Sequence, residues 1–269
     1  MLQPFRNLKT RIQSRYRRDA ARLFGRRMAR LSLDAPIISF TFDDFPRSAL
    51  HTGGAIMAQY GVRGTYYTSL GLMDQEIPAG HAFSAEDLQQ VLDKGHELGC
   101  HTFAHCDAWE TIPQTFEASI VQNRRTLECL APGAVMRTLS YPISGPRPQT
   151  KRLAARHFAC SRGGGQRHNV GQVDLNNLAA FFLERSRDNP DRIKAMIDRN
   201  KDEQGWLIFA THEVCPNPSH FGCTPAFFED IVRYSVDSGA QILPVGESFD
   251  AIFQPVPSGT SLARGRVVV

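Results

Sequence analysis

Five residues that could carry out chemistry occur at three points in the sequence, and each point follows a short apolar run. They are the adjacent carboxylates Asp43 and Asp44, the pair His101 and His105, and the single histidine His212. Each run has the length of a strand, and the carboxyl ends of parallel strands meet at one face of a barrel. We therefore expect these side chains, far apart in the sequence, to meet in one site.

These residue types suit a divalent metal ion and a hydrolytic reaction. Two imidazoles four residues apart lie on the same face of a helical turn, and one carboxylate completes a triad that leaves coordination positions open. A metal ion in such a site lowers the pKa of its bound water and polarises a carbonyl group. The second carboxylate is then free to act as a general base, and a histidine on the opposite wall could protonate the leaving group. The pattern predicts metal-assisted hydrolysis of an amide or an ester.

Each cluster taken alone is weak evidence. A chain with this many aspartates contains an adjacent pair by chance, and a lone histidine is most often structural. The information lies in their shared position, because all three clusters follow predicted strands.

Hydrophobic periodicity predicts the elements that must position these residues. Runs typical of strands cover 37–42, 64–69, 136–141, 157–160, 178–183, 206–211 and 241–243, with a further short strand before Cys100. Stretches typical of helices cover 48–60, 84–95, 113–130, 148–156, 190–203 and 225–238. Strands that alternate with helices favour a parallel α/β fold, and the number of units favours a barrel over an open sheet.

The composition is that of a globular protein with one large domain or two modest ones. Of 269 residues, 42% are hydrophobic and 22% are charged, which excludes a disordered chain. No apolar stretch approaches the roughly 20 residues of a membrane-spanning helix. The six cysteines form no Cys-x-x-Cys pair, so a zinc ribbon is not expected.

Positive charge is concentrated at the N-terminus. Residues 1–30 hold ten cationic residues and one acid, a net charge of +9, whereas the rest of the chain holds 21 cationic and 26 acidic residues, a net charge of −5. Apolar residues recur there at every fourth position: Leu8, Ile12, Tyr16, Ala20, Phe24 and Met28. This spacing predicts a basic amphipathic helical arm over 1–33. Such an arm could pack on the body, lie on an anionic membrane surface or serve as a transit peptide.

The motifs, taken in order, resemble those of the NodB-type polysaccharide deacetylases, the family 4 carbohydrate esterases. They are Thr-Phe-Asp-Asp ending at Asp44, His-Thr-x-x-His from His101 to His105, a Tyr-Pro turn at 141–142, and Thr-His ending at His212. The resemblance runs from about residue 36 to about residue 250. It implies a distorted (β/α)7 barrel that removes N-acetyl or O-acetyl groups from sugars. It also implies one divalent metal ion, with zinc expected and cobalt, nickel or manganese as alternatives.

The resemblance implies a role for each matching position. Asp43 matches the catalytic base and His212 the general acid. The metal ligands match Asp44, His101 and His105. The turn formed by Tyr141 and Pro142 would present the backbone N–H of Ile143 as the oxyanion donor, and Ile208 would line the acetyl pocket.

Two motifs depart from the family pattern. The family sequence Arg-x-Pro-Tyr reads Ser-Tyr-Pro-Ile here, so Ser140 replaces the arginine that would orient the base. Arg137, Arg147 and Arg162 are candidates to supply the missing charge. For the fourth motif, Asp174 is predicted to orient His212, although it could also simply form a turn before the next strand.

Together these features predict a metal-dependent deacetylase with a catalytic barrel over 34–254 and a loose tail over 255–269. Its N-acetylated sugar could belong to a polysaccharide, an oligosaccharide, or a lipid-linked or nucleotide-linked glycan precursor. The sequence shows no signal peptide, so we expect a cytoplasmic protein with peripheral contact to an anionic inner membrane through residues 1–30. Nucleic acid is not expected as a partner, because no motif of a nucleic-acid-binding fold is present. Two alternatives are a catalytically degenerate relative that binds a glycan or a partner, and an amidase acting on a non-sugar amide.

Overall fold

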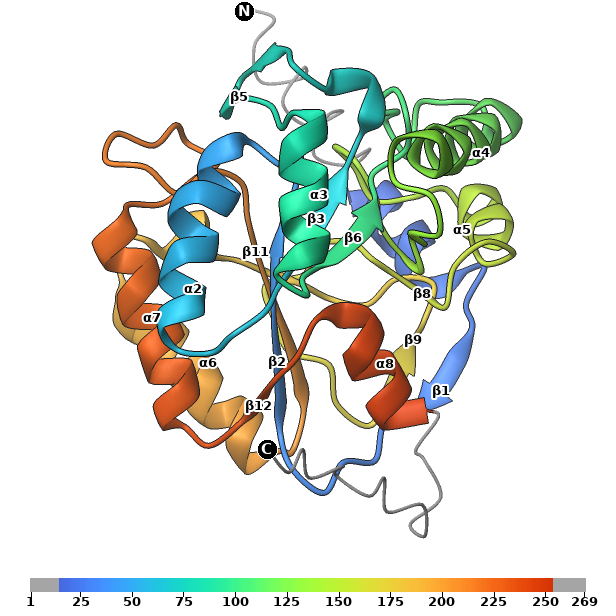
Figure 1. Ribbon diagram of the computed structural model, residues 1–269. Coiled ribbons are helices and arrows are strands. Elements are labelled where there is room, and N and C mark those ends of the chain that lie inside the picture. Colours follow the sequence, from blue (N-terminus) through green and yellow to red (C-terminus); the bar gives the residue numbers. More distant parts are fainter. Residues whose placement is uncertain (1–14, 254–269) are drawn as a thin grey trace, which may run out of the picture.

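The fold is built around a parallel sheet whose strands follow the predicted apolar runs (Figure 1). In the computed structural model, which describes residues 15–253, the order is β10-β11-β2-β3-β6-β7-β8, and β12 also pairs with β2. All of these described pairings are parallel. The strands are β2 (Ile37–Phe42), β3 (Thr65–Thr68), β6 (Glu97–Cys100), β7 (Thr138–Ser140), β8 (Cys160–Arg162), β10 (Phe181–Phe182), β11 (Trp206–Thr211) and β12 (Gln241–Ile242).

The sheet curls until its two ends approach each other. Arg162, at the end of β8, forms a parallel bridge with Leu178, which lies shortly before β10. The N–H of Leu178 donates to the carbonyl of Ser161, and the N–H of Gly163 donates to the carbonyl of Leu178. The predicted fold class, an α/β distorted barrel, is confirmed.

Helices cover the outer face of this sheet, with α2, α6 and α7 on one side and α4 and α5 on the other (Figure 1). The helical segments are η1 (Ala49–Gly54), α2 (Ala55–Gln59), η2 (Leu70–Leu72), α3 (Ala85–Asp93), α4 (Pro113–Leu130), α5 (Pro148–Ala154), η3 (Leu183–Ser186), α6 (Pro190–Asp202), α7 (Pro225–Asp237) and α8 (Val245–Phe253). Their starts follow local rules. Ser84 forms a capping box before α3, Thr224 caps α7, and a proline begins each of α4 to α7.

Some elements were not predicted from the sequence. These are α8 and two short antiparallel ribbons, β1 (Met28–Arg30) with β9 (Gln172–Asp174) and β4 (Glu76–Ile77) with β5 (Gly80–His81). The ribbon strands are two or three residues long, so they carry no periodicity to read. β1 and β9 meet only because the barrel brings distant segments together.

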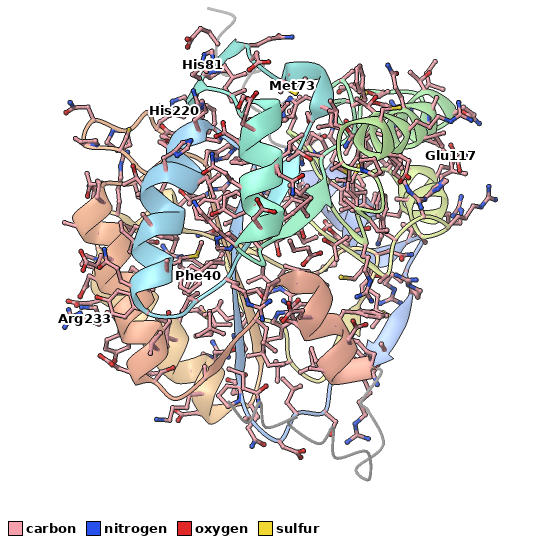
Figure 2. The ribbon with its side chains drawn as sticks, in the orientation of Figure 1. Phe40, Met73, His81, Glu117, His220 and Arg233 are labelled. Atoms are coloured by element: carbon pink, nitrogen blue, oxygen red, sulfur yellow. The ribbon has the colours of Figure 1, made fainter. Side chains whose placement is uncertain are left out.

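The core lies on both faces of the central strands. Every residue of β2 and β11 is buried, which is the pattern of parallel strands covered on each face. Phe40 lies in the interior beside α2, whereas Arg233 points outward from α7 (Figure 2). Met73, His81 and His220 lie at the end of the molecule toward which β3 and β6 point (Figure 2). The loops that follow the strands therefore gather at that end.

The segment before β2 packs on the barrel. Residues 15–23 are helical, with Ala20 and Ala21 buried and Tyr16 edge-on to Trp109. Arg17 forms an ion pair with Glu110. Tyr16, Phe24 and Met28, three members of the predicted apolar stripe, are largely exposed. The other predictions for this arm at 1–14, and the predicted tail from 255, lie outside the described residues.

Lys151 ties this helix to the barrel. Its ammonium group, on α5, is fully buried and donates to the carbonyls of Ala21 and Phe24 at the helix end, at 2.7 and 2.9 Å. It also pairs with Asp174 at 2.5 Å. A cation at a helix C-terminus satisfies carbonyls that have no partner within the helix. Within residues 15–253, no helix is both long and apolar enough to cross a bilayer.

We expect Lys151→Met to destabilise the protein by about 3 kcal/mol, because it leaves Asp174 without its counter-ion and two carbonyls without a donor. Arg152→Met, at an exposed neighbour on the same helix, is the control and should change stability by less than about 0.5 kcal/mol. Urea denaturation of both variants gives the comparison. Equal stability of the two variants would show that Lys151 does not anchor the helix.

Candidate active site

The five residues singled out from the sequence meet in one cleft at the carboxyl ends of the strands. Asp43 and Asp44 follow β2, His101 follows β6 and is itself followed by His105, and His212 follows β11. All five line a cavity of about 1040 Å³, which is at the upper end of the range for ligand sites. The convergence predicted for the strand ends is confirmed.

Asp44, His101 and His105 form the candidate metal centre. The Nε2 atoms of His101 and His105 lie 3.5 and 3.1 Å from Oδ1 of Asp44, and one donor atom from each residue lies within 4.8 Å of the others. Donors about 2.1 Å from a tetrahedral ion lie roughly 3.4 Å from one another, so these spacings fit a bound zinc-sized ion. Oδ1 of Asp44 is also buried with no well-formed hydrogen bond among the described residues. Within residues 15–253, this is the one cluster of its kind.

The surroundings of His101 select the ring nitrogen that faces the centre. Its Nδ1 lies 2.8 Å from the carbonyl oxygen of Ser140. A carbonyl only accepts, so Nδ1 carries the proton and Nε2 presents a lone pair. Burial lowers the pKa of His101 to about 4, which keeps the ring neutral as a ligand must be.

The backbone is strained at the same place. Asp44, Thr102, His105 and Ile143 have φ values of 59°, 59°, 48° and 63°. Non-glycine residues seldom adopt this left-handed conformation, and it clusters where the surrounding structure must aim a side chain. The loops after β2, β6 and β7 each store some of this strain.

Arg162 supplies the positive charge beside Asp43. Its guanidinium lies 2.5 Å from Oδ1 of Asp43, and both side chains are buried. Burial would raise the pKa of Asp43, but the charge of Arg162, helped by His101 and His212, outweighs burial and lowers it. Of the three arginines considered from the sequence, Arg137 instead pairs with Asp250, and Arg147 precedes α5.

His212 faces the metal centre from the end of β11. Its Nε2 lies 3.9 Å from Oδ2 of Asp44, and its Nδ1 lies 3.2 Å from the carbonyl oxygen of Phe221. The carbonyl fixes Nδ1 as the protonated nitrogen and directs Nε2 into the cleft. Asp174, expected to orient His212, is held instead by Lys151 and by the N–H groups of Arg27 and Asn176.

The remaining predicted residues divide between the cleft and the core. Tyr141 and Ile143 line the cleft, and Pro142 accepts the N–H of Ala108. The N–H of Ile143 has no acceptor among the described residues. Ile208 is fully buried in the core and is not part of the cleft wall.

A match to known proteins agrees with this geometry. The family model described as polysaccharide deacetylase matches residues 31–158. These residues belong to the polysaccharide deacetylase family. The match contains the Asp-Asp and His-x-x-x-His motifs, so the resemblance inferred from the motifs is confirmed. None of the curated proteins matches the chain.

Solved structures share the deacetylase fold at low sequence identity. A family 4 acetyl xylan esterase from Clostridium thermocellum, in complex with a cobalt ion, is 18% identical (TM-score 0.57), covering 80% of this chain and 91% of its own. A peptidoglycan N-acetylglucosamine deacetylase is 17% identical (TM-score 0.57), covering 84% and 92%. A family 4 pseudoenzyme from Bacillus anthracis is 13% identical (TM-score 0.59), covering 81% and 67%. The fold therefore occurs in active and inactive relatives.

Glu184 is a cleft residue that sequence reasoning missed. It lies on η3, directly after β10, and its Oε2 is buried without a hydrogen-bond partner. Burial raises its pKa to about 8, so the carboxyl group is largely protonated at neutral pH. The sequence contained a signal for this residue, because Glu184 directly follows the predicted strand 178–183, just as Asp43 directly follows the predicted strand 37–42.

Replacing a residue of the candidate metal centre should weaken metal binding strongly. We expect His101→Ala to weaken zinc binding by roughly 100-fold or more, because the triad loses the ligand with the best-fixed orientation. His81→Ala, at an exposed histidine on β5, should bind like the wild type. Isothermal titration with zinc measures the affinity of each variant. Equal zinc affinity in the two variants would contradict the candidate metal centre.

The raised pKa of Glu184 predicts a pH-dependent cost to stability. Above pH 4.5 the unfolded chain ionises this group while the fold keeps it protonated, so its contribution to the free energy of unfolding falls as the pH rises toward 8. Glu184→Gln should therefore stabilise the protein more at pH 9 than at pH 5, as measured by urea denaturation. Glu128→Gln, at an exposed position on α4, should have the same effect at both pH values. If Glu184→Gln changes stability by the same amount at pH 5 and at pH 9, the raised pKa of Glu184 is contradicted.

Proposed function

We propose that this protein is a metal-dependent hydrolase that removes the acetyl group from an N-acetylated sugar. The observation that carries the proposal is the meeting of three parts in one cleft. They are a carboxylate paired with Arg162, a three-ligand metal centre and a histidine aimed at that centre. Family membership and the shared fold support the same reaction class.

The chain's own residues suit the two proton transfers of amide hydrolysis. Asp43, kept ionised by Arg162, accepts a proton from the water whose oxygen bonds to the acetyl carbon. As the carbon–nitrogen bond breaks, His212 in its doubly protonated imidazolium form donates the proton on Nε2 to the departing amine, while the Nδ1–H stays bonded to the carbonyl of Phe221. The products are acetate and a free amino sugar.

The carbonyl oxygen of the substrate gains negative charge as water attacks. The free N–H of Ile143, held by its left-handed backbone at the mouth of the cleft, is placed to stabilise that charge. In other enzymes, removal of one such donor raises the reaction barrier by about 3 kcal/mol. Asp44, His101 and His105 would hold a divalent ion, zinc by its donor set, that polarises the carbonyl and acidifies water.

The finer substrate assignment is a lipid-linked or nucleotide-linked glycan precursor. The basic helix at 15–23 borders the cleft and exposes Tyr16 and Leu23 beside its arginines, and Phe24, directly after it, is exposed as well. Exposed apolar side chains among arginines suit the surface of an anionic membrane. We infer peripheral membrane contact through this helix.

A second function is a relative that binds a glycan without turnover. The altered third motif and the Bacillus anthracis pseudoenzyme of the same fold favour this alternative. Arg162 weakens that case, because it replaces the charge that the motif lacks. An amidase acting on a non-sugar amide would use the same catalytic groups on a different substrate.

Acetate release from an acetylated chitooligosaccharide tests the proposal. Asp43→Asn should lower kcat by about 10²- to 10⁴-fold while zinc content stays at the wild-type level, because it removes the base and keeps the ligands. Asp188→Asn, at an exposed position before α6, is the control and should match the wild type.

Zinc bound without acetate release from any acetylated sugar would contradict the deacetylase proposal. It would favour the binding relative or the amidase instead.

A further inference from the structure

The cleft that holds the metal centre is also lined by exposed arginines from three parts of the chain. Arg18 and Arg22 lie on the helix at 15–23 and Arg26 follows it. Arg167 lies beyond β8, and Arg185 lies on η3. All five line the same cavity as Asp43 and His212.

These charges are poorly compensated. Apart from the groups already assigned to catalysis, three carboxyl groups line the cleft. Asp174 is bonded to Lys151, Glu184 is largely protonated at neutral pH, and Asp19 is the only one left to oppose the arginines. Asp19 lies 3.8 Å from Arg22, and Arg18, Arg26 and Arg167 have no carboxylate partner among the described residues. The segments outside 15–253 contain no aspartate or glutamate.

The concentration of charge is local, because residues 31–269 carry a net charge of −5. A positive cleft on a mildly acidic body attracts an anion to that cleft in particular. The cations are all arginines, and no lysine lines the cavity. A guanidinium presents two parallel N–H donors that match the oxygens of a phosphate, which favours phosphate recognition over simple charge attraction.

The three arginines near the N-terminus are held at the cleft by fixed contacts. Lys151 binds the end of their helix, the pair Arg17–Glu110 holds its side, and β1 pairs with β9 just after it. The backbone that carries these arginines is therefore in place before a ligand arrives, which lowers the entropy cost of binding one.

We propose that this arginine cluster, Arg18, Arg22, Arg26, Arg167 and Arg185, binds a phosphate group that the substrate carries beside its acetylated sugar. The inference deepens the proposed deacetylase function and rests on it for the sugar. A nucleotide diphosphate and a lipid headgroup both carry this chemistry.

UDP-N-acetylglucosamine is the probe, because it joins two phosphates to an N-acetylated sugar in one soluble molecule, and N,N′-diacetylchitobiose is the neutral acetylated comparison. Titration calorimetry with the zinc-loaded protein gives both affinities. We expect the wild type to bind the charged probe at least tenfold more tightly, with an affinity that falls as salt is added. This preference for the charged probe should be largely lost in Arg18→Gln/Arg22→Gln/Arg26→Gln and should fall by roughly threefold in Arg167→Gln/Arg185→Gln.

The matched control is Arg124→Gln/Arg125→Gln/Arg152→Gln, which removes three exposed charges on α4 and α5, outside the cleft. It should bind the charged probe like the wild type. If the control and the helix variant lose the same affinity for the charged probe, net charge alone explains the effect and the proposal is overturned. Equal affinity of the wild type for the two probes would overturn it too.

Phosphatidylglycerol vesicles distinguish the two sources of phosphate. If vesicle binding falls in both cleft variants and the soluble probe displaces the vesicles, lipid phosphate enters the same site, as the proposal requires. If vesicle binding falls only in the helix variant while the soluble probe does not bind, the arginines serve a membrane surface and the cleft proposal fails. Binding requires no turnover, so loss of acetate release with phosphate binding intact would overturn the proposed function alone.

Discussion

The site depends on a buried ion pair between Asp43 and Arg162. A carboxylate in this interior would bind a proton and lose its charge without a cation beside it. Arg162 comes from the end of β8, which β3, β6 and β7 separate from β2 in the sheet. The pair therefore forms only because the sheet curls. Since Asp44 is the next residue, fixing Asp43 also fixes the carboxylate of the candidate metal centre.

The same curl explains how residues that follow different strands meet in one cleft. β2, β6, β7 and β11 run parallel, so the loops that follow them open at one end, where helices leave room for a cleft. The carbonyl of Ser140, the last residue of β7, orients His101, and the carbonyl of Phe221, in the loop after β11, orients His212. Backbone carbonyls thus select the ring nitrogens of these two histidines, and left-handed φ values set the backbone at Asp44 and His105. The segment before the barrel becomes part of the cleft wall because Lys151 binds the end of its helix.

Much of the fold could be predicted from the sequence. The strand 206–211 and the helix 113–130 have the predicted bounds, since a fully apolar strand and a helix that starts at a proline are marked locally. The strand predicted at 178–183 shortens to Phe181–Phe182 because Leu178 leaves the ladder to bridge β8. Tyr16 and Phe24 belong to a regular stripe, but the helix buries Ala20 and Ala21 instead, because small side chains allow close approach to α5 and its loop.

The sequence by itself determined the chemical types and their order along the chain. Asp43, Asp44, His101, His105 and His212 each follow a strand, and parallel strands bring such positions together whatever their separation. The tertiary structure alone decided which charges stand beside them. It selected Arg162 from three candidate arginines, paired Asp174 with Lys151 in place of His212, and left Glu184 in the wall of the same cleft with Oε2 buried. Those choices depend on distances between side chains of distant segments, and spacing within a sequence carries no information about such distances.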